Sequence, residues 1–365
     1  MSIGMVCVLL LGCTKAPTAE ETGVSPATAD TSVAPDRASV VLEGTSESRL
    51  GSAFATWNDQ LLVGAPGIGD FPGSVLRVDA THSSHTLATG DSLGTTGLGT
   101  AIVFSSGELY VESNAPAFYR WQADALVLAA MEPLGNVGDL DGDGLNDRIL
   151  PQTSGEVLVF WGSGAPPSVI EHPPPVNGGP VRVSGFALEG TTVFLSFTEL
   201  DADGLGLYRI ADATEDIDLS MHDPWLPNES TIWPLGDVDS DGAPEYLTAE
   251  GGLYTDSDGL PTLVLGMDRR VRSVAVVGDE LFIMDEDAVL SHYPDPMGGL
   301  LRGDAAGAWH RPEGRTSTSE RLYGFRLVAW DADGNGAPEI YFSDPADSTT
   351  TGVAHGALFV VDPSP

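Results

Sequence analysis

Short apolar runs separated by turn residues make up the sequence from Ala38 onward. The runs consist mainly of Val, Leu, Phe and Tyr, and Gly, Asp, Asn and Pro lie between them. β-Branched and aromatic residues favour strands, whereas Gly, Pro, Asn and Asp favour turns. The pattern therefore predicts an all-β fold built from many short strands, without long helices.

One order of elements returns along the chain: strand, tight turn, strand, glycine-rich loop, strand. It is clearest in Leu50–Asp79 and Leu322–Asp362. Weaker copies occupy Leu98–Trp121, Leu134–Trp161, Val183–Ile210, Trp233–Tyr254 and Arg272–Tyr293. Successive copies are about 45 residues apart, and a fourth short strand fits between one copy and the next. Seven units of four strands predict a seven-bladed β-propeller.

The two ends of the repeat region predict how the ring closes. The last unit stops after its third strand, Ala357–Val361, and Ser39–Gly44 reads as a fourth strand that precedes the first unit. We therefore expect this N-terminal strand to complete the last blade, which would leave no exposed sheet edge at the junction.

The first residues carry a separate signal. The apolar run Ile3–Cys13 ends in Leu-Leu-Gly-Cys and resembles a bacterial lipoprotein signal peptide, in which the cysteine becomes the lipidated mature N-terminus. An ordinary buried strand and a simple secretion signal are the alternatives. The Ala-, Thr-, Pro- and Glu-rich stretch that follows has the composition of a disordered tether. The predicted organisation is a signal peptide at 1–13 with lipidation at Cys13, a tether at 14–37 and the propeller at 38–365.

Charge and cysteine content narrow the function. The chain has 53 acidic and 16 basic residues and a formal net charge of −37, which disfavours nucleic acid and anionic membrane surfaces as partners. Both cysteines, Cys7 and Cys13, precede the predicted propeller, so no disulfide, zinc–thiolate site or cysteine nucleophile is expected in it. No later stretch approaches the roughly 18 apolar residues of a membrane-spanning helix. We expect a cell-envelope or cell-surface location, with membrane contact only through the lipid anchor, or secretion.

Three nine-residue loops share a sharper pattern. Each has oxygen side chains at positions 1, 3, 5 and 9, glycine at position 6 and a backbone carbonyl available at position 7. Hard oxygen ligands in this number suit Ca²⁺, and carboxylates held this close would otherwise repel one another. The predicted ligands of the first loop are Asp139, Asp141, Asp143, Leu145 and Asp147. Those of the second are Asp237, Asp239, Asp241, Ala243 and Glu245, and those of the third are Asp331, Asp333, Asn335, Ala337 and Glu339. Leu145, Ala243 and Ala337 contribute backbone oxygens.

The spacing distinguishes these loops from EF-hands. Position 12 of an EF-hand loop is a bidentate Glu, but here it is Leu150, Thr248 or Phe342. The loops recur at roughly two repeat units, which places them between strands 1 and 2 of blades three, five and seven. The stretch Glu199–Gly204 carries a similar run of acids between strands 2 and 3, and we interpret it as an ordinary acidic loop.

These features together resemble the FG-GAP family, whose repeats build the seven-bladed propeller of integrin α-subunit heads and related bacterial surface proteins. Gly51–Phe54, Val63–Pro66, Tyr323–Phe325 and the three acidic loops carry the resemblance, which spans roughly Ser39 to Asp362. It implies about three structural Ca²⁺ sites on one face of the ring. It also implies a non-enzymatic binding or adhesion module for an extracellular protein or carbohydrate.

Two alternatives remain open. A polysaccharide lyase would need a His/Tyr pair in a basic cleft, and only Arg269–Arg272 approaches a cluster of basic residues. A passive structural module of the envelope would need no soluble ligand. The tripeptide Arg302–Asp304 and the aromatic residues Trp225, Trp309 and Tyr293 are weaker candidates for a recognition site, with chance occurrence or core packing as the simpler interpretations.

Overall fold

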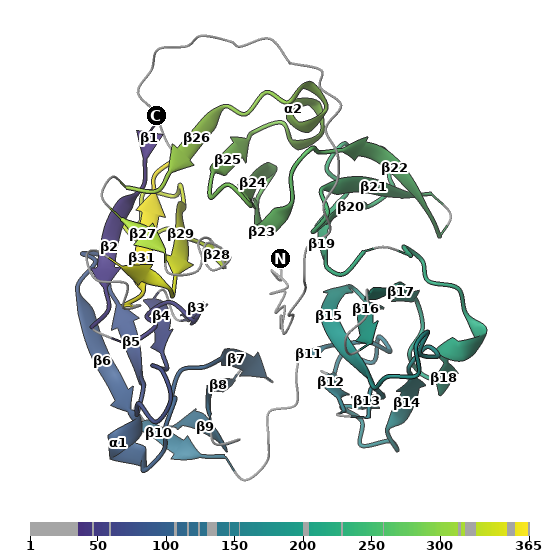
Figure 1. The fold of residues 1–365 in the computed structure, drawn as a ribbon, viewed down its shortest axis with the longest axis horizontal. Coiled ribbons are helices and arrows are strands. Elements are labelled where there is room, and N and C mark those ends of the chain that lie inside the picture. Colours follow the sequence, from purple (N-terminus) through teal and green to yellow (C-terminus); the bar gives the residue numbers. More distant parts are fainter. Residues whose placement is uncertain are drawn as a thin grey trace.

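The fold is a ring of seven β-sheets, seen along its axis in Figure 1. The structure is a computed structural model. It describes residues 36–363 except 46, 58–59, 106–107, 115–116, 123–124, 130–136, 146, 153, 200–203, 228, 258, 313–314, 318–325 and 349–354. The predicted seven-bladed β-propeller is confirmed. The expected signal peptide, Cys13 and residues 14–35 of the expected tether lie outside the described residues.

Blades one, two and seven each contain four strands, and the N-terminal strand completes blade seven. Blade one comprises β3 (Ala53–Trp57), β4 (Gln60–Ala65), β5 (Ser74–Val78) and β6 (Ser84–Thr89). Blade two comprises β7 (Ile102–Ser105), β8 (Glu108–Ser113), β9 (Ala117–Gln122) and β10 (Ala125–Leu128). Blade seven comprises β28 (Leu327–Trp330), β29 (Glu339–Asp344), β31 (Ala357–Val361) and β2 (Ser39–Glu43).

Blade five also has four strands, whereas blades three, four and six have five, three and five. Blade three comprises β11 (Val137–Gly138), β12 (Asp147–Pro151), β13 (Val157–Phe160), β14 (Ser168–Glu171) and β18 (Ile217–Asp218). Blade four comprises β15 (Val181–Glu189), β16 (Thr192–Glu199) and β17 (Gly204–Ile210). Blade five comprises β19 (Ile232–Gly236), β20 (Glu245–Thr248), β21 (Gly252–Ser257) and β22 (Leu260–Gly266). Blade six comprises β23 (Val271–Val277), β24 (Glu280–Asp285), β25 (Leu290–Tyr293), β26 (Gly307–His310) and β1 (Asp36–Arg37).

Helical and small elements are few. The helices α1 (Gly90–Leu93) and α2 (Pro296–Arg302) and the 3₁₀ turn η1 (Leu219–Met221) lie between strands. Strands β27 (Thr316–Ser317) and β30 (Asp347–Ser348) form a separate two-stranded sheet. None of the helices in the described part of the chain has the length and apolar character needed to cross a membrane.

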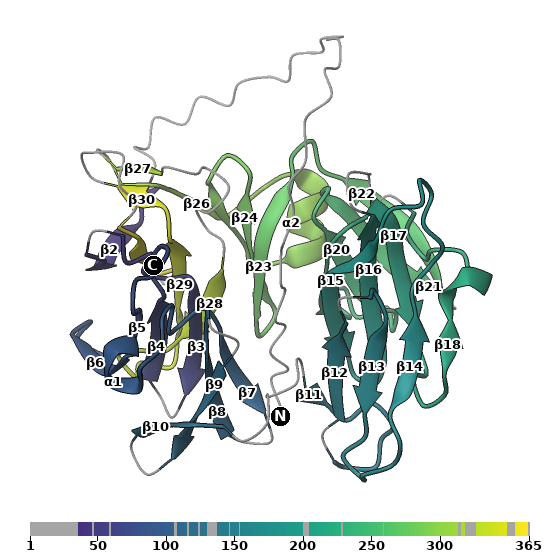
Figure 2. The same cartoon turned by 60° about the horizontal axis from the view of Figure 1, so that its bottom comes forward.

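Burial explains why the apolar runs of the sequence are nearly continuous rather than alternating. The second strands β4, β16, β24 and β29 are buried along almost their whole length, because neighbouring blades cover both of their faces. The outermost strands β6 and β22 are mostly exposed. In the tilted view of Figure 2, the strands of blades three and four lie side by side with their axes roughly aligned.

The hydrophobic core is divided among the interfaces between blades. Phe54 and Val63 of blade one pack with Tyr341 and Leu358 of blade seven, for example. Corresponding clusters join blades one and two, three and four, four and five, five and six, and six and seven. The apolar side chains are therefore buried between neighbouring blades, and one cluster joins the first blade to the last.

The N-terminal strand closes the ring as predicted. In β2, Ser39 pairs with Val360 and Glu43 with Ala357 of β31 in an antiparallel ladder. Just before it, β1 pairs in parallel with β26, where Asp36 lies opposite Trp309. The two strands on either side of Ala38 thus join blade six to blade seven.

Blade four contradicts the expectation of four strands in every unit. After β17 the chain crosses to blade three, where β18 pairs in parallel with the outer strand β14 (Figure 1). It then returns to β17 only at a single bridge between Leu207 and Leu226. Pro224 falls opposite Arg209 in this antiparallel register and has no N–H to donate, so the ladder ends there.

Candidate functional site

The three acidic loops lie where the repeat predicts them. They connect β11 to β12, β19 to β20 and β28 to β29, the first and second strands of blades three, five and seven. In blades one, two, four and six the same connection has two residues, as between Val277 and Glu280. Since the first-to-second connections of all blades lie at the same end of the ring, the three loops share one face.

All three loops fold through the same hydrogen bonds. The carboxylate at position 1 accepts from the N–H of the glycine at position 6. The distances are 2.9 Å from Gly144 to Asp139, 3.1 Å from Gly242 to Asp237 and 2.9 Å from Gly336 to Asp331. These glycines have φ of +84°, +94° and +90°, a conformation that residues with a side chain rarely adopt. The sharp turn predicted at position 6 is therefore present three times.

The middle positions repeat in the same way. The side chain at position 3 accepts from the N–H at position 5, at 3.0 Å for Asp141 and Asp143. The side chain at position 5 accepts from the N–H at position 7, at 2.7 Å for Asp143 and Leu145. Both bonds recur in the second and third loops within 0.1 Å of these distances. In the first two loops, acidic side chains at positions 1, 3 and 9 lie close together as a result.

The acid at position 9 anchors each loop to the blade. One oxygen of Asp147, Glu245 and Glu339 accepts from the N–H at position 2, at 2.7, 2.9 and 2.9 Å. These side chains come from the start of β12, β20 and β29, and their residues are 0%, 0% and 9% exposed. Burying an acid is costly unless its charge is matched.

Several carboxylate oxygens have no hydrogen-bond partner although they are buried. They are Asp139 Oδ1, Asp331 Oδ1 and Glu245 Oε1, one in each loop. In the first loop, ligand oxygens of Asp139, Asp141 and Asp147 lie within 4.8 Å of one another, and in the second loop so do those of Asp237, Asp239 and Glu245. Buried, unpaired oxygens grouped this closely fit a hard divalent cation.

Two acids of the loops have a raised pKa. The N–H of Asp143 lowers the pKa of Asp141, but burial and the carboxylates of Asp143, Asp147 and Asp139 outweigh it and raise the pKa above its usual range. Burial raises the pKa of Glu245, against the lowering effect of the Val238 N–H. Neighbouring carboxylates thus oppose ionisation of Asp141, whereas burial is the main cause for Glu245.

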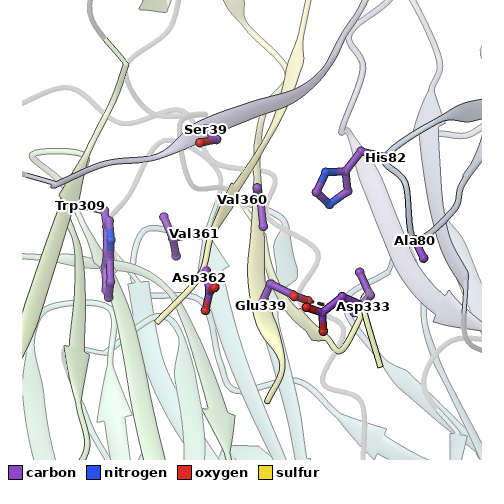
Figure 3. Close-up of a pocket in the computed structure, with 10 residues that line it drawn as sticks. Ser39, Ala80, His82, Trp309, Asp333, Glu339, Val360, Val361 and Asp362 are labelled. Carbon is purple, nitrogen blue, oxygen red and sulfur yellow. Dashed lines mark hydrogen bonds between the residues drawn. The ribbon is translucent and has the colours of Figure 1, made fainter. Parts of the chain in front are cut away.

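The third loop differs from the other two. Asn335 replaces an acid at position 5, and its amide donates to Asp333 Oδ2 at 3.0 Å. Asp333 and Glu339 also line a cavity of about 530 Å³ together with His82, Trp309 and Asp362 (Figure 3). The third loop therefore carries one carboxylate fewer and borders an accessible space.

A His/Tyr pair lies beside this cavity. His82 from the β5–β6 turn and the hydroxyl of Tyr341 in β29 are 2.8 Å apart. Burial raises the pKa of Tyr341, and the carboxylates of Glu339 and Asp333 raise it further. Acidic surroundings are the opposite of the basic cleft that a lyase needs.

The basic residues considered for such a cleft are already paired. Arg269 contacts Asp285 at 2.6 Å, and Arg270 contacts Glu250 at 2.9 Å. Sequence reasoning had no means of finding these pairs or the His82–Tyr341 contact, because all of them join segments that are not adjacent in the chain.

The weaker candidates for a recognition site lie in the core, in a loop or at a helix end. Tyr293 is 3% exposed and belongs to the core between blades five and six. Trp225 packs on Phe194 and Tyr246. Arg302–Asp304 is exposed at the end of α2. Glu199, treated as an ordinary loop acid, accepts from the N–H groups of Val176, Asn177 and Gly179.

Comparison with known proteins finds similar folds but no protein of closely related sequence. No protein-family model matches the chain, and no curated protein matches its sequence. Raptor from Chaetomium thermophilum is similar in structure, with 11% identity and a TM-score of 0.51 over 89% of this chain and 29% of that one. Sqt1 from Saccharomyces cerevisiae has 10% identity and a TM-score of 0.49, over 90% of this chain and 100% of that one. YCF48 bound to D1 peptide has 10% identity and a TM-score of 0.47, over 91% and 96%. At such identities the similarity concerns the fold alone.

Proposed function

We propose that the chain is a calcium-binding propeller of the FG-GAP type that acts as a non-enzymatic binding or adhesion module at the cell surface. The observation that carries the proposal is the same hydrogen-bonded loop in three alternate blades, each with a buried carboxylate oxygen that has no partner. The side chains at positions 1, 3, 5 and 9 would hold Ca²⁺, and the carbonyls of Leu145, Ala243 and Ala337 would complete the sites.

Bound calcium would neutralise the acids and tie each loop to its blade. The first loop brings four carboxylates, the second four and the third three. Affinity depends on the number of charged ligands, and extracellular calcium modules typically have dissociation constants of about 10⁻⁴–10⁻³ M. We therefore expect the third site to be the weakest.

The binding role rests on the fold and the surface rather than on a catalytic site. A propeller ring is compatible with a scaffold that presents loops to a partner, and fold alone does not decide function. The one His/Tyr pair close to a cavity has acidic neighbours, and the arginines considered for a basic cleft are paired. These observations favour a binding module over the lyase alternative. An extracellular protein or carbohydrate is the proposed partner class.

The location proposed for this module follows from the N-terminal sequence. Lipidation of Cys13 would anchor the protein to the outer membrane or cell surface, and residues 14–37 would tether the propeller to that anchor.

Thermal unfolding with calcium and with excess chelator tests the calcium sites. We expect calcium to raise the melting temperature, because a ligand that binds only the folded state stabilises it. Asp139→Asn, Asp237→Asn and Asp331→Asn should each reduce this rise. Asp279→Asn, in the exposed two-residue turn of blade six, is the matched control and should leave it unchanged. Identical melting curves in calcium and in chelator would overturn the proposal.

A further inference from the structure

The outer edge of blade four lacks the strand that should cover it. Leu207 of β17 exchanges two backbone hydrogen bonds with Leu226, at 2.9 and 3.1 Å, so its N–H and C=O point outward. In a strand, the backbone groups of alternate residues point to the same edge, so those of Arg209 also point outward. Within the described residues, no backbone hydrogen bond on that side reaches Arg209. An outward donor and acceptor pair is therefore open next to the Leu207–Leu226 bridge.

A cavity of about 540 Å³ lies along this open stretch. Residues 208–212 form one wall, and Pro224, Trp225 and Leu260 contribute to the others. The Trp225 wall is fixed, because its indole N–H donates to the Gly259 carbonyl at 3.2 Å and its ring packs on Phe194 and Tyr246. The cavity is thus a preformed space between a strand edge and apolar side chains.

The rim of the cavity is both apolar and acidic. Leu260 is 70% exposed, and Ile217, Leu219 and Pro261 add apolar surface to the lining. Asp212 and Asp223 also line the cavity and are exposed. The guanidinium of Arg209 does not offset them, because it is paired with the buried carboxylate of Asp256 at 3.2 Å.

Other blade edges of this protein already accept short extended segments. The two residues of β18 pair in parallel with β14 on blade three, and the two residues of β1 pair with β26 on blade six. Blade four has no fourth strand of its own, because the segment that would supply it passes to blade three and forms β18 there. Its edge therefore remains as a template for a further strand.

We propose that the cavity binds a short extended segment of a partner protein, which pairs with β17 at Arg209 and alternates apolar with basic residues. Backbone pairing gives such a segment affinity, and alternate side chains would enter the apolar cavity and face the acidic rim. A second copy of this chain is a poorer occupant, because two chains of charge −37 would bring the same acidic rims together. The inference refines the partner of the proposed binding module and does not depend on calcium.

Fluorescence polarisation of the full chain with a labelled peptide tests the site. The probe is a peptide of about five residues that alternates Val and Lys, because only the part of the β17 edge beyond the Leu207–Leu226 bridge is open. Its first control alternates Val and Glu, and its second carries N-methyl groups on the backbone nitrogens of one edge. We expect the Val/Glu peptide not to bind. Loss of the edge hydrogen bonds should weaken the N-methylated peptide by roughly tenfold or more.

Exposed substitutions then locate the binding. Leu260→Asp and Asp223→Lys should weaken the Val/Lys peptide, whereas Leu128→Asp should not, because Leu128 is equally exposed (67%) but lies on the outer strand of blade two. Equal binding of the N-methylated peptide, or equal loss in Leu128→Asp, would overturn the proposal. Dimerisation in analytical ultracentrifugation that Leu260→Asp abolishes would assign the cavity to a second copy instead. Binding in chelator separates this result from the calcium experiment: the peptide should bind there even if the loops fail to bind calcium.

Discussion

Glu245→Gln gives the most discriminating test of the second acidic loop. Glu245 is fully buried; one oxygen accepts from Val238 N–H and the other, Oε1, has no partner. The substitution keeps the shape and the acceptor for Val238 and removes the charge. The side chain of Thr255 lies close enough to Glu245 to lower its pKa, and its hydroxyl oxygen can accept from the new amide N–H.

The predicted effect changes sign with calcium. In chelator, removal of a buried charge whose pKa is already raised should leave the unfolding free energy unchanged or higher. In about 10 mM calcium, a site with a dissociation constant of roughly 10⁻⁴ M contributes ~2.7 kcal/mol to the wild type. The variant should lose most of this, which corresponds to about 4 °C in melting temperature for a propeller of this size.

Differential scanning calorimetry of the wild type, Glu245→Gln and the Asp279→Asn control, in calcium and in chelator, measures both values. A merely structural role for Glu245 would lower the melting temperature in both conditions by the same amount. That outcome, or a variant that responds to calcium as the wild type does, would refute the reasoning.

Four further predictions concern other parts of the molecule. Truncation through Glu43 should expose the edge of β31 and cause self-association in size-exclusion chromatography, whereas truncation through residue 35 should not, because β1 and β2 remain. Tyr246→Phe should lower stability by about 1–3 kcal/mol in urea unfolding, because Glu189 loses the hydroxyl that contacts it at 2.5 Å. Burial raises the folded-state pKa of Glu189, so Glu189 stabilises the wild type fully only below its unfolded-state pKa. The wild type loses this stabilisation as the pH rises through the folded-state pKa. Glu189→Gln should remove this pH-dependent loss. Cys13→Ser should release the protein from the membrane fraction, as measured by fractionation and immunoblotting; unchanged membrane association would contradict the lipid anchor.

The sequence alone determined the local and periodic features of this protein. The repeat of about 45 residues predicted seven blades, and the surplus strand at Ser39–Gly44 predicted the pairing of β2 with β31. The spacing of acids and glycine predicted the three loops between first and second strands. These features were readable because each depends on residues close together in the chain, whose strand, turn and ligand preferences repeat in register.

Only the tertiary structure decided which distant segments meet. The transfer of β18 to blade three and the open edge of blade four depend on competition between two sheet edges for one segment, and no local preference encodes that choice. Other features likewise arise only when neighbouring strands and blades pack. They are the burial of Glu245, the pairing of Arg269 with Asp285 and the contact of His82 with Tyr341. The sequence shows which residues can carry charge or donate hydrogen bonds, whereas the ring determines which of them are sealed from water and which remain open to a partner.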